Sequence, residues 1–268
     1  MHPTNNELTQ QSNKTAHTVL YTACDEVYLR RFGIAFSMAA AKQGWPVHIS
    51  AIKEDNQEKL IGLLSLIKHS FKKVSRDQVE LTWSIDQPWR SWTNEEERRA
   101  ILASNRFFTA AMHLHELKKP LLIADTDALV TKAPQDAPPA DKIGIFVRDA
   151  DLDPTNADWI KLGTAVNAGL VNIPDNAAGQ AFLNAIKDQI EQQNLEWYSD
   201  QASIYICYTR AKEKEDIFML NENHLGWEDN SWKRSLLWSA KGSRKEENTT
   251  FKKKQKRLLR LFSKALAD

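Results

Sequence analysis

The sequence predicts an α/β fold with a mainly parallel central sheet and helices on both of its faces. Strand-like and helix-like segments alternate through most of the 268 residues, as in sheets whose strands are joined by helical crossovers. The apolar run at 121–124 ends in two aspartates, Asp125 and Asp127, which indicates a buried strand reaching the edge of the sheet. Ligands bind at the carboxyl ends of such strands, so this pair is the first candidate site. A solvated Asp-Thr-Asp turn is the alternative.

Three strands, each followed by a helix, are expected in the first half of the chain. The strands span 17–23, 46–52 and 78–85, and the helices span 25–44, 55–70 and about 93–118. Apolar residues at helical spacing predict the first helix, and Gly44 with Pro46 ends it. A Thr-x-x-Glu box at Thr93 and Glu96 predicts the start of the third helix.

The second half continues the alternation after the aspartates. Short apolar runs predict strands at 142–149, 164–173, 215–221 and 234–240. Helices are expected from about Asn176 to Gln193 and from Ser199 or Asp200 onward. The Pro-rich segment 133–142 is interpreted as a connection within one domain, because no repeat or low-complexity linker divides the chain. We therefore expect a disordered lead at 1–16, a folded domain at 17–245 and a C-terminal helix at 246–268.

The net charge of +1 conceals a basic tail. From Lys241 onward ten Lys or Arg face three Asp or Glu, so the preceding part is acidic overall. Cys24 and Cys207 lie far apart without metal-ligand spacing, which argues against a disulfide framework or a zinc site. The first residues lack the apolar core of a signal peptide, and no segment is long and apolar enough to span a membrane. A cytoplasmic location is expected.

Six short motifs follow one another in an order that resembles the GT-A class of nucleotide-sugar glycosyltransferases. They are YTACDEVY at 21–28, NRFFTAAMHL at 105–114, DTD at 125–127, NAGLVNI at 167–173, SDQASIY at 199–205 and SAKGSRK at 239–245. Over roughly 17–245 the chain most resembles glycosyltransferase family 8 and its bacterial lipopolysaccharide-modifying relatives. The resemblance implies that 17–245 is a catalytic domain with the Rossmann-like GT-A fold. It also implies transfer of a hexose from a nucleotide-diphosphate sugar, expected to be a UDP-sugar, to a hydroxyl of a glycan or glycolipid.

Asp125 and Asp127 are the expected metal ligands. Two carboxylates in an i, i+2 relation can approach one hard divalent cation, Mn²⁺ or Mg²⁺, which can in turn hold substrate phosphates. Family 8 enzymes commonly supply a histidine ligand just before a Lys-Gly-like turn, whereas this chain has Trp238 and Ser239 there. His224 is the nearest candidate third ligand, and a structural histidine is the alternative. This departure leaves retention or inversion at the anomeric carbon open.

The resemblance also assigns residues to the donor. Backbone groups at the end of the first strand would bind the nucleobase, a tyrosine would stack on it, and an arginine would lie near the diphosphate or sugar. A lysine in a glycine turn would contact the diphosphate leaving group. The residues so assigned are Thr22, Ala23, Tyr28, Arg106, Asp125, Gly169, Lys241 and Gly242. The alternatives are a core position for Tyr28, a surface salt bridge for Arg106 and the start of the basic tail for Lys241.

Two further motifs are placed at the reacting sugar by the resemblance. Asn167 and Gly169 interrupt a strand-like run, and a small residue there permits close approach of a ligand to the backbone. A β-bulge without a ligand is the alternative. Asp200 and Gln201 begin a helix, where resembling enzymes place a residue near the sugar. An N-cap role is the alternative for Asp200. We take Asn167, Asp200 and Gln201 as the catalytic candidates.

The nine tryptophans and the tail suggest contacts with other molecules. Trp89 and Trp92 flank Arg90 in a polar loop and form a candidate acceptor surface, although most tryptophans are expected to pack in the core. The segment 251–266 has an apolar and a basic side, so it can lie on an anionic membrane surface. Docking on the protein's own surface is one alternative, and a nucleic-acid contact, which is not expected, is the other.

Two rival functions are carried forward. A sugar-nucleotide or glycan-binding module could keep the fold without turnover. A haloacid-dehalogenase-like phosphatase also places Asp-x-Asp after a strand, but that motif usually comes early in the chain and Leu129 stands where Thr or Val is usual.

Overall fold

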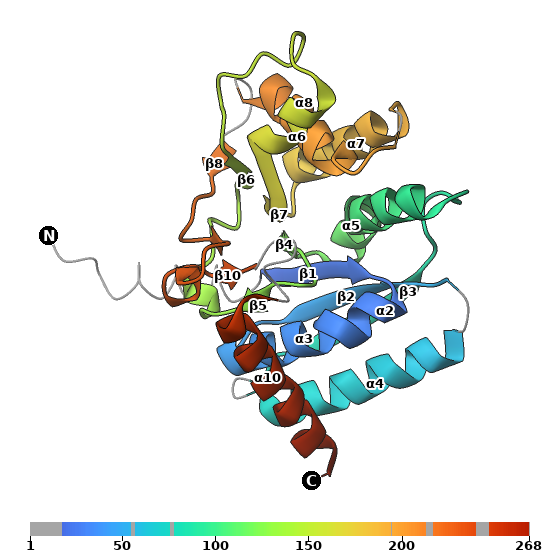
Figure 1. Ribbon diagram of the computed structural model, residues 1–268, viewed down its shortest axis with the longest axis vertical. Coiled ribbons are helices and arrows are strands. Elements are labelled where there is room, and N and C mark those ends of the chain that lie inside the picture. The colour runs from blue at the N-terminus through green and yellow to red at the C-terminus, as the bar shows by residue number, and fades with distance from the viewer. Residues whose placement is uncertain are drawn as a thin grey trace, which may run out of the picture.

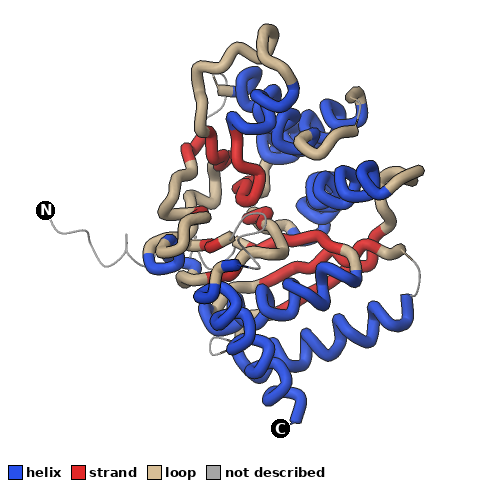
Figure 2. Tube along the Cα trace, in the orientation of Figure 1, coloured by secondary structure: helices blue, strands red, loops and turns tan. Residues whose placement is uncertain are grey.

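A computed structural model describes residues 18–54, 57–75, 78–193, 195–212, 217–239 and 247–267. A seven-stranded sheet has the order β3-β2-β1-β4-β7-β6-β8, and a three-stranded sheet has the order β5-β10-β9. Figure 1 shows the helices arranged around the larger sheet, and Figure 2 shows the strands at the centre of the molecule. The predicted α/β fold with a mainly parallel central sheet is confirmed.

The first four strands of the large sheet are parallel to one another. They are β1 (Val19–Cys24), β2 (Val47–Ile52), β3 (Leu81–Asp86) and β4 (Leu121–Ala124). The helices that connect them are α2 (Glu26–Tyr28), the π-helical turn η1 (Leu29–Gly33), α3 (Ile34–Gln43), α4 (Gln57–Val74) and α5 (Glu95–Leu117). All residues of β2 and β4 are buried, because helices cover both faces.

The chain reverses direction after β4. Strand β7 (Val166–Ile173) runs antiparallel to β4 and to β6 (Ile143–Val147), and β8 (Ile217–Met219) adds to β6 in parallel. The helices of this half are α6 (Trp159–Ala165), α7 (Ala177–Glu191) and α8 (Ser199–Ala211). The small sheet consists of β5 (Leu129–Val130), β9 (Leu225–Gly226) and β10 (Leu237–Trp238), with the 3-10 turns η2 (Pro134–Asp136) and η3 (Ser231–Lys233) nearby in sequence.

The two faces of the large sheet carry separate hydrophobic cores. One core joins the strands to α3 and α4, and the other joins them to α5, α6, α7 and α8. In Figure 1, α3 and α4 lie below β1 and β2, whereas α5 lies above them. The carboxyl ends of β1 and β4 therefore open between two helical layers.

The start of α5 differs by one residue from the predicted capping box. Asn94 is the N-cap and accepts a hydrogen bond from the Glu97 backbone N–H, at 2.9 Å. The Glu97 carboxylate reaches back to the Thr93 backbone N–H and hydroxyl, each at 2.8 Å. Asparagine competes well with threonine for the N-cap position, which explains the shift of the box from Glu96 to Glu97.

The C-terminal helix α10 (Thr249–Ala267) packs against α3 and α4, as Figure 1 shows. Phe251 is buried against the Trp238 ring, with 5.2 Å between ring centroids, and Gln255 donates to the Arg31 carbonyl at 2.7 Å. Docking of the apolar side on the protein's own surface is therefore observed, and a membrane contact through the basic side stays a prediction. Within the described ranges, every helix is too short or too polar to cross a bilayer.

A buried polar network lies between β2, β3 and α5. The Asp86 carboxylate accepts from the hydroxyls of Ser84 at 2.6 Å and Ser50 at 2.7 Å, and it lies 3.0 Å from His113 Nε2. Glu116 lies 2.8 Å from the other ring nitrogen of His113, and the ring centroids of His48 and His113 are 4.8 Å apart. These partners satisfy a carboxylate that could not otherwise be buried.

The network shifts the pKa of its members in opposite directions. Burial raises the pKa of Asp86, but hydrogen bonds from His113, Ser84 and Ser50 outweigh it and lower the pKa to about 2. Burial lowers the pKa of His113, yet its hydrogen bonds to Asp86 and Glu116 outweigh that effect and raise it. Burial and the neighbouring His113 lower the pKa of His48 to about 4. A proton is therefore held more readily by His113 than by His48.

We predict that Asp86→Asn lowers the free energy of unfolding by about 3 kcal/mol near pH 6, because His113 loses its buried counter-charge. The depressed pKa of Asp86 makes its contribution complete above the ordinary value of 3.8 and lost as the pH falls toward 2. The raised pKa of His113 makes its contribution complete below 6.5 and lost at higher pH. Urea unfolding of both proteins across this pH range measures the difference, and a difference independent of pH would contradict the prediction.

Candidate active site

The Asp125-Thr126-Asp127 turn is anchored to the end of β1. The Thr126 hydroxyl lies 2.6 Å from the Thr22 hydroxyl and donates to the Ala23 carbonyl at 3.3 Å. The Asp125 backbone N–H donates to the Gly169 carbonyl of β7 at 3.1 Å. The middle residue of the turn is thus directed into the protein and ties β4 to β1. The aspartates flank it, with Asp127 8% exposed and the Asp125 side chain 27% exposed.

Arg106 joins two of the predicted site residues. Its guanidinium donates through Nη1 to Asp125 Oδ1 and through Nη2 to Asp200 Oδ2, the latter at 2.7 Å. Arg106 lies on α5 and Asp200 on α8, and both side chains are almost fully buried. Burial raises the pKa of Asp200, with Asp125 adding to the effect and Arg106 opposing it. The arginine is thus in a buried cluster, so the surface salt bridge considered above is not what the structure shows.

Asp200 is directed at Arg106 and does not cap α8. Tyr198 holds the N-cap position, and Asp200 accepts from the Gln201 backbone N–H at 2.8 Å through its second oxygen. Gln201 itself is partly exposed beside this group. The capping alternative for Asp200 is therefore not observed, because the aspartate lies inside the first turn of the helix.

The Asn167-Ala168-Gly169 segment forms an irregular part of β7 against Asp125. The pairing of β6 with β7 shifts between Ile145, opposite Val171, and Phe146, opposite Asn167, so the β-bulge considered above is present. The Asn167 side chain accepts from the Gly169 backbone N–H at 3.1 Å. A Cβ at Gly169 would lie 2.8 Å from Asp125 Oδ2. The bulge, together with the missing side chain at Gly169, therefore lets the β7 backbone approach the Asp125 carboxylate closely.

Tyr28 lies at the rim of this cluster and outside the core. The residue is 43% exposed, and its ring is 5.3 Å from that of Phe32. Burial raises the pKa of Tyr28, while among nearby charges Arg31 opposes the shift and Asp125 adds to it. The core position considered for Tyr28 is therefore not observed, because the side chain is exposed.

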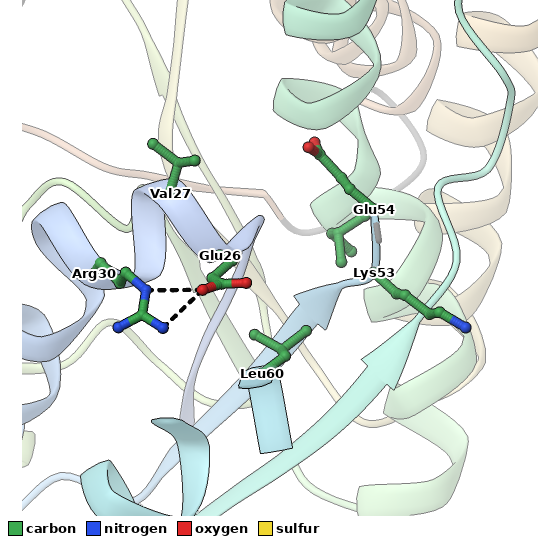
Figure 3. A pocket seen from close by; sticks show the side chains of 7 residues that line it. Glu26, Val27, Arg30, Lys53, Glu54 and Leu60 are labelled. Atoms are coloured by element: carbon green, nitrogen blue, oxygen red, sulfur yellow. Dashed lines mark hydrogen bonds and ion pairs between the residues drawn. The ribbon is translucent and has the colours of Figure 1, made fainter. Parts of the chain in front are cut away.

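A hollow of about 290 Å³ lies where β2 ends, and residues before and after Tyr28 line it, whereas Tyr28 itself does not. Figure 3 shows side chains of α2 and of the segment after β2 around it, including Val27, Lys53 and Glu54. Arg98 of α5 ties its rim together, because it lies 2.6 Å from Asp25 and 2.8 Å from Glu54. Arg98, Asp25 and Glu54 were not among the predicted site residues. Asp25 nevertheless follows a buried strand, as Asp125 does.

Other predicted residues have different surroundings. The His224 side chain lies 3.0 Å from Asn221 Oδ1 and edge-on to the Phe218 ring, and its role as a ligand stays a prediction. One face of Trp89 is stacked on Phe108 at 4.3 Å, and its indole N–H donates to Ser104. Trp92 is partly exposed and Arg90 exposed. Lys241 and Gly242 lie outside the described residues.

The residues present fit a divalent cation with an oxygen-rich shell. Asp125 and Asp127 supply hard carboxylate oxygens, and Asp125 Oδ1 also accepts from Arg106. Among the described residues no group of three His, Cys, Asp or Glu side chains could hold a metal by itself. Mg²⁺ and similar cations usually retain waters and bind substrate phosphates, so two carboxylates suffice for such a site.

Comparison with known proteins bears on the fold. No family model matches the sequence, and no curated protein sequence matches it significantly. The glycosyltransferase GlyE of Streptococcus pneumoniae TIGR4 superposes with a TM-score of 0.56 at 12% identity, covering 92% of this chain and 63% of that one. The bifunctional glycosyltransferase WbbM, in its apo form, superposes with a TM-score of 0.53 at 10% identity, covering 90% and 52% respectively.

The chain has a GT-A-like glycosyltransferase fold. It spans less than two thirds of the length of either of these glycosyltransferases. At this level of identity the likeness establishes the fold, and the predicted assignment to family 8 stays a prediction.

We predict that Gly169→Ala displaces the Asp125 carboxylate and lowers the free energy of unfolding by about 1–3 kcal/mol, because the new methyl group overpacks the bulge. Gly62→Ala is the matched control, since a Cβ there meets nothing within 4 Å in the exposed part of α4. That control should gain about 0.5–1 kcal/mol from its helix position. Thermal or urea unfolding measures both, and equal shifts would contradict the close approach.

Arg106→Gln should lower the free energy of unfolding by about 3–5 kcal/mol, because Asp125 and Asp200 lose their shared counter-charge. Arg106→Lys should lose less, since it keeps the positive charge but lacks the planar fork that reaches two carboxylates. Urea unfolding near neutral pH measures the two values. Equal losses in the two variants would show that charge plays no part.

Proposed function

We propose that this protein is a metal-dependent glycosyltransferase that moves a hexose from a nucleotide-diphosphate sugar, a UDP-sugar by resemblance, to a hydroxyl of a glycan or glycolipid. The observation that carries the proposal is the Asp125 and Asp127 pair at the end of β4, with Arg106 joining Asp125 to Asp200. The GT-A-like fold supports it, because the turn follows a strand of the parallel half of the sheet.

Asp125 and Asp127 would hold Mn²⁺ or Mg²⁺, which when bound neutralises the charge that develops on the departing diphosphate. The nucleoside would bind near the carboxyl ends of β1 and β2, with the exposed Tyr28 ring against the base. Arg106 would keep Asp125 in one orientation, so that the carboxylate costs little reorganisation when the donor binds. Lys241 and Gly242 would contact the leaving group.

Asp200, Gln201 and Asn167 would face the sugar. Asp200 and Asn167 are buried and hydrogen-bonded, which fixes their orientation before the substrate arrives. The acceptor hydroxyl would approach between these residues and the loop that carries Trp89 and Trp92. A cytoplasmic location at the inner face of the membrane would suit a glycolipid acceptor.

Two rivals predict different behaviour. A phosphatase of the haloacid-dehalogenase type would need Asp125 as a nucleophile, whereas the chain has a GT-A-like fold. A binding module without turnover would keep nucleotide-sugar affinity and lack transfer. The experiments below separate these cases.

We expect the melting temperature to rise with one nucleotide diphosphate and its sugar, and only in the presence of Mn²⁺ or Mg²⁺, because binding to the folded state alone stabilises it. Asp125→Ala should abolish that rise. A panel of nucleotides and nucleotide sugars with each metal measures the shift. No shift with any member of the panel would contradict a donor site.

Asp127→Asn should lower the turnover of the nucleotide sugar by at least about a hundredfold with the melting temperature nearly unchanged, because it removes one metal-binding charge. Asp136→Asn is the matched control, since it removes the same charge from an exposed side chain of η2. Release of the free nucleotide diphosphate measures turnover. Absence of turnover in the unaltered protein, with the thermal shift present, would favour the binding module.

A further inference from the structure

A second hollow, which we term the basic groove, lies between α10 and the C-terminal ends of α3 and α4. Its volume is about 570 Å³, and its lining contains five basic side chains, four aliphatic ones and no acidic one. The basic residues are Lys42, Lys73, Arg257, Arg260 and Lys264. The successive helices α3 and α4 and the distant helix α10 thus bring positive charge to one space.

These five charges lack acidic partners in the described part of the chain, where no ion pair involves any of them. Several other basic residues of the protein do form such pairs, including Arg30, Arg98 and Arg106. Burial lowers the pKa of the neighbouring Lys254, and Arg257 and Lys42 lower it further. Among the described residues, therefore, no ion pair offsets the positive charge that lines the groove.

The preference for cations at the C-terminal ends of helices explains only some of the basic residues in the groove. Lys42, Lys73 and Lys264 each lie in the last turn of a helix, where the macrodipole favours a cation. Arg257 and Arg260 lie in the middle of α10, so the same explanation does not apply to them. The docking of α10 on α3 and α4 brings the two groups of charges together.

The basic groove is separate from the candidate active site. The C-terminal ends of α3 and α4 precede β2 and β3, so they lie at the amino edge of the parallel strands. Asp125 lies at the carboxyl edge, after β4. In Figure 1, β1 runs toward α2, whereas α10 lies toward the other end of the sheet. A ligand of the groove is therefore distinct from the donor.

We propose that the basic groove binds a phosphate-bearing anion, of the kind present on anionic lipid headgroups and on soluble polyphosphates. A multiply charged phosphate group matches a set of converging Lys and Arg side chains, and arginine can hold it through two parallel hydrogen bonds. The apolar side of α10 stays docked in this complex, so the binding is electrostatic and weakens with salt. Anion binding at the basic groove does not depend on glycosyl transfer.

The test uses the full-length protein with two probes, vesicles of phosphatidylcholine containing phosphatidic acid and inorganic tripolyphosphate in solution. Lys42→Gln with Lys73→Gln removes two groove charges outside α10, and Arg257→Gln with Arg260→Gln removes two from α10. Lys252→Gln with Lys253→Gln is the matched control, because both residues are exposed on the same helix and do not line the groove. Sedimentation measures vesicle binding, and calorimetry measures tripolyphosphate binding.

We expect each groove variant to weaken binding at least about tenfold and the control by less than about threefold, with unchanged melting temperatures. Loss with vesicles alone would identify a headgroup as the source of the phosphate, and loss with both probes would identify a site for phosphate in general. Equal losses in the Lys42/Lys73 variant and the control would overturn the groove and leave only a diffuse basic tail. If the unaltered protein binds neither probe, the proposed phosphate site is overturned as well.

Discussion

The Arg106 guanidinium, held between Asp125 and Asp200, is the constraint on which the arrangement of the site depends. It joins α5 to the end of β4 and to α8, and so connects the parallel half of the sheet with the antiparallel half. Buried ion pairs of this kind contribute little net stability, because desolvation offsets most of their attraction. The cluster instead fixes positions, because it holds side chains from three distant segments in one arrangement.

Helix α5 carries polar groups on the side that faces the sheet, which is unusual for a covering helix. Asn105 accepts from the Trp89 backbone in the loop after β3, Arg106 meets Asp125 after β4, and His113 meets Asp86 of β3 farther along the same helix. These polar contacts fix the position of the helix along the sheet, in addition to its apolar contacts. A slide of α5 by one turn would break both sets of bonds together.

The sequence was sufficient to predict the fold class and the strand before Asp125, because buried runs and strand ends have strong local signals. It did not reveal that Arg106 meets Asp200, since that contact joins residues 94 positions apart. The bulge at Asn167 and the antiparallel direction of β7 depend on pairing that no local pattern encodes. The amphipathic tail was recognised as a helix, whereas the surface that covers its apolar side was not, because periodicity alone does not specify a partner.

The docking of α10 also determines when the apolar surface of α3 is covered during synthesis. A ribosome delivers β1, α3 and α4 early, and domains generally fold from the N-terminal side as they emerge. The surface of α3 that meets Phe251 stays uncovered until α10 has left the exit tunnel. The nascent chain therefore exposes this apolar surface until α10 docks, and a product that lacks α10 would be a substrate for chaperones and proteases.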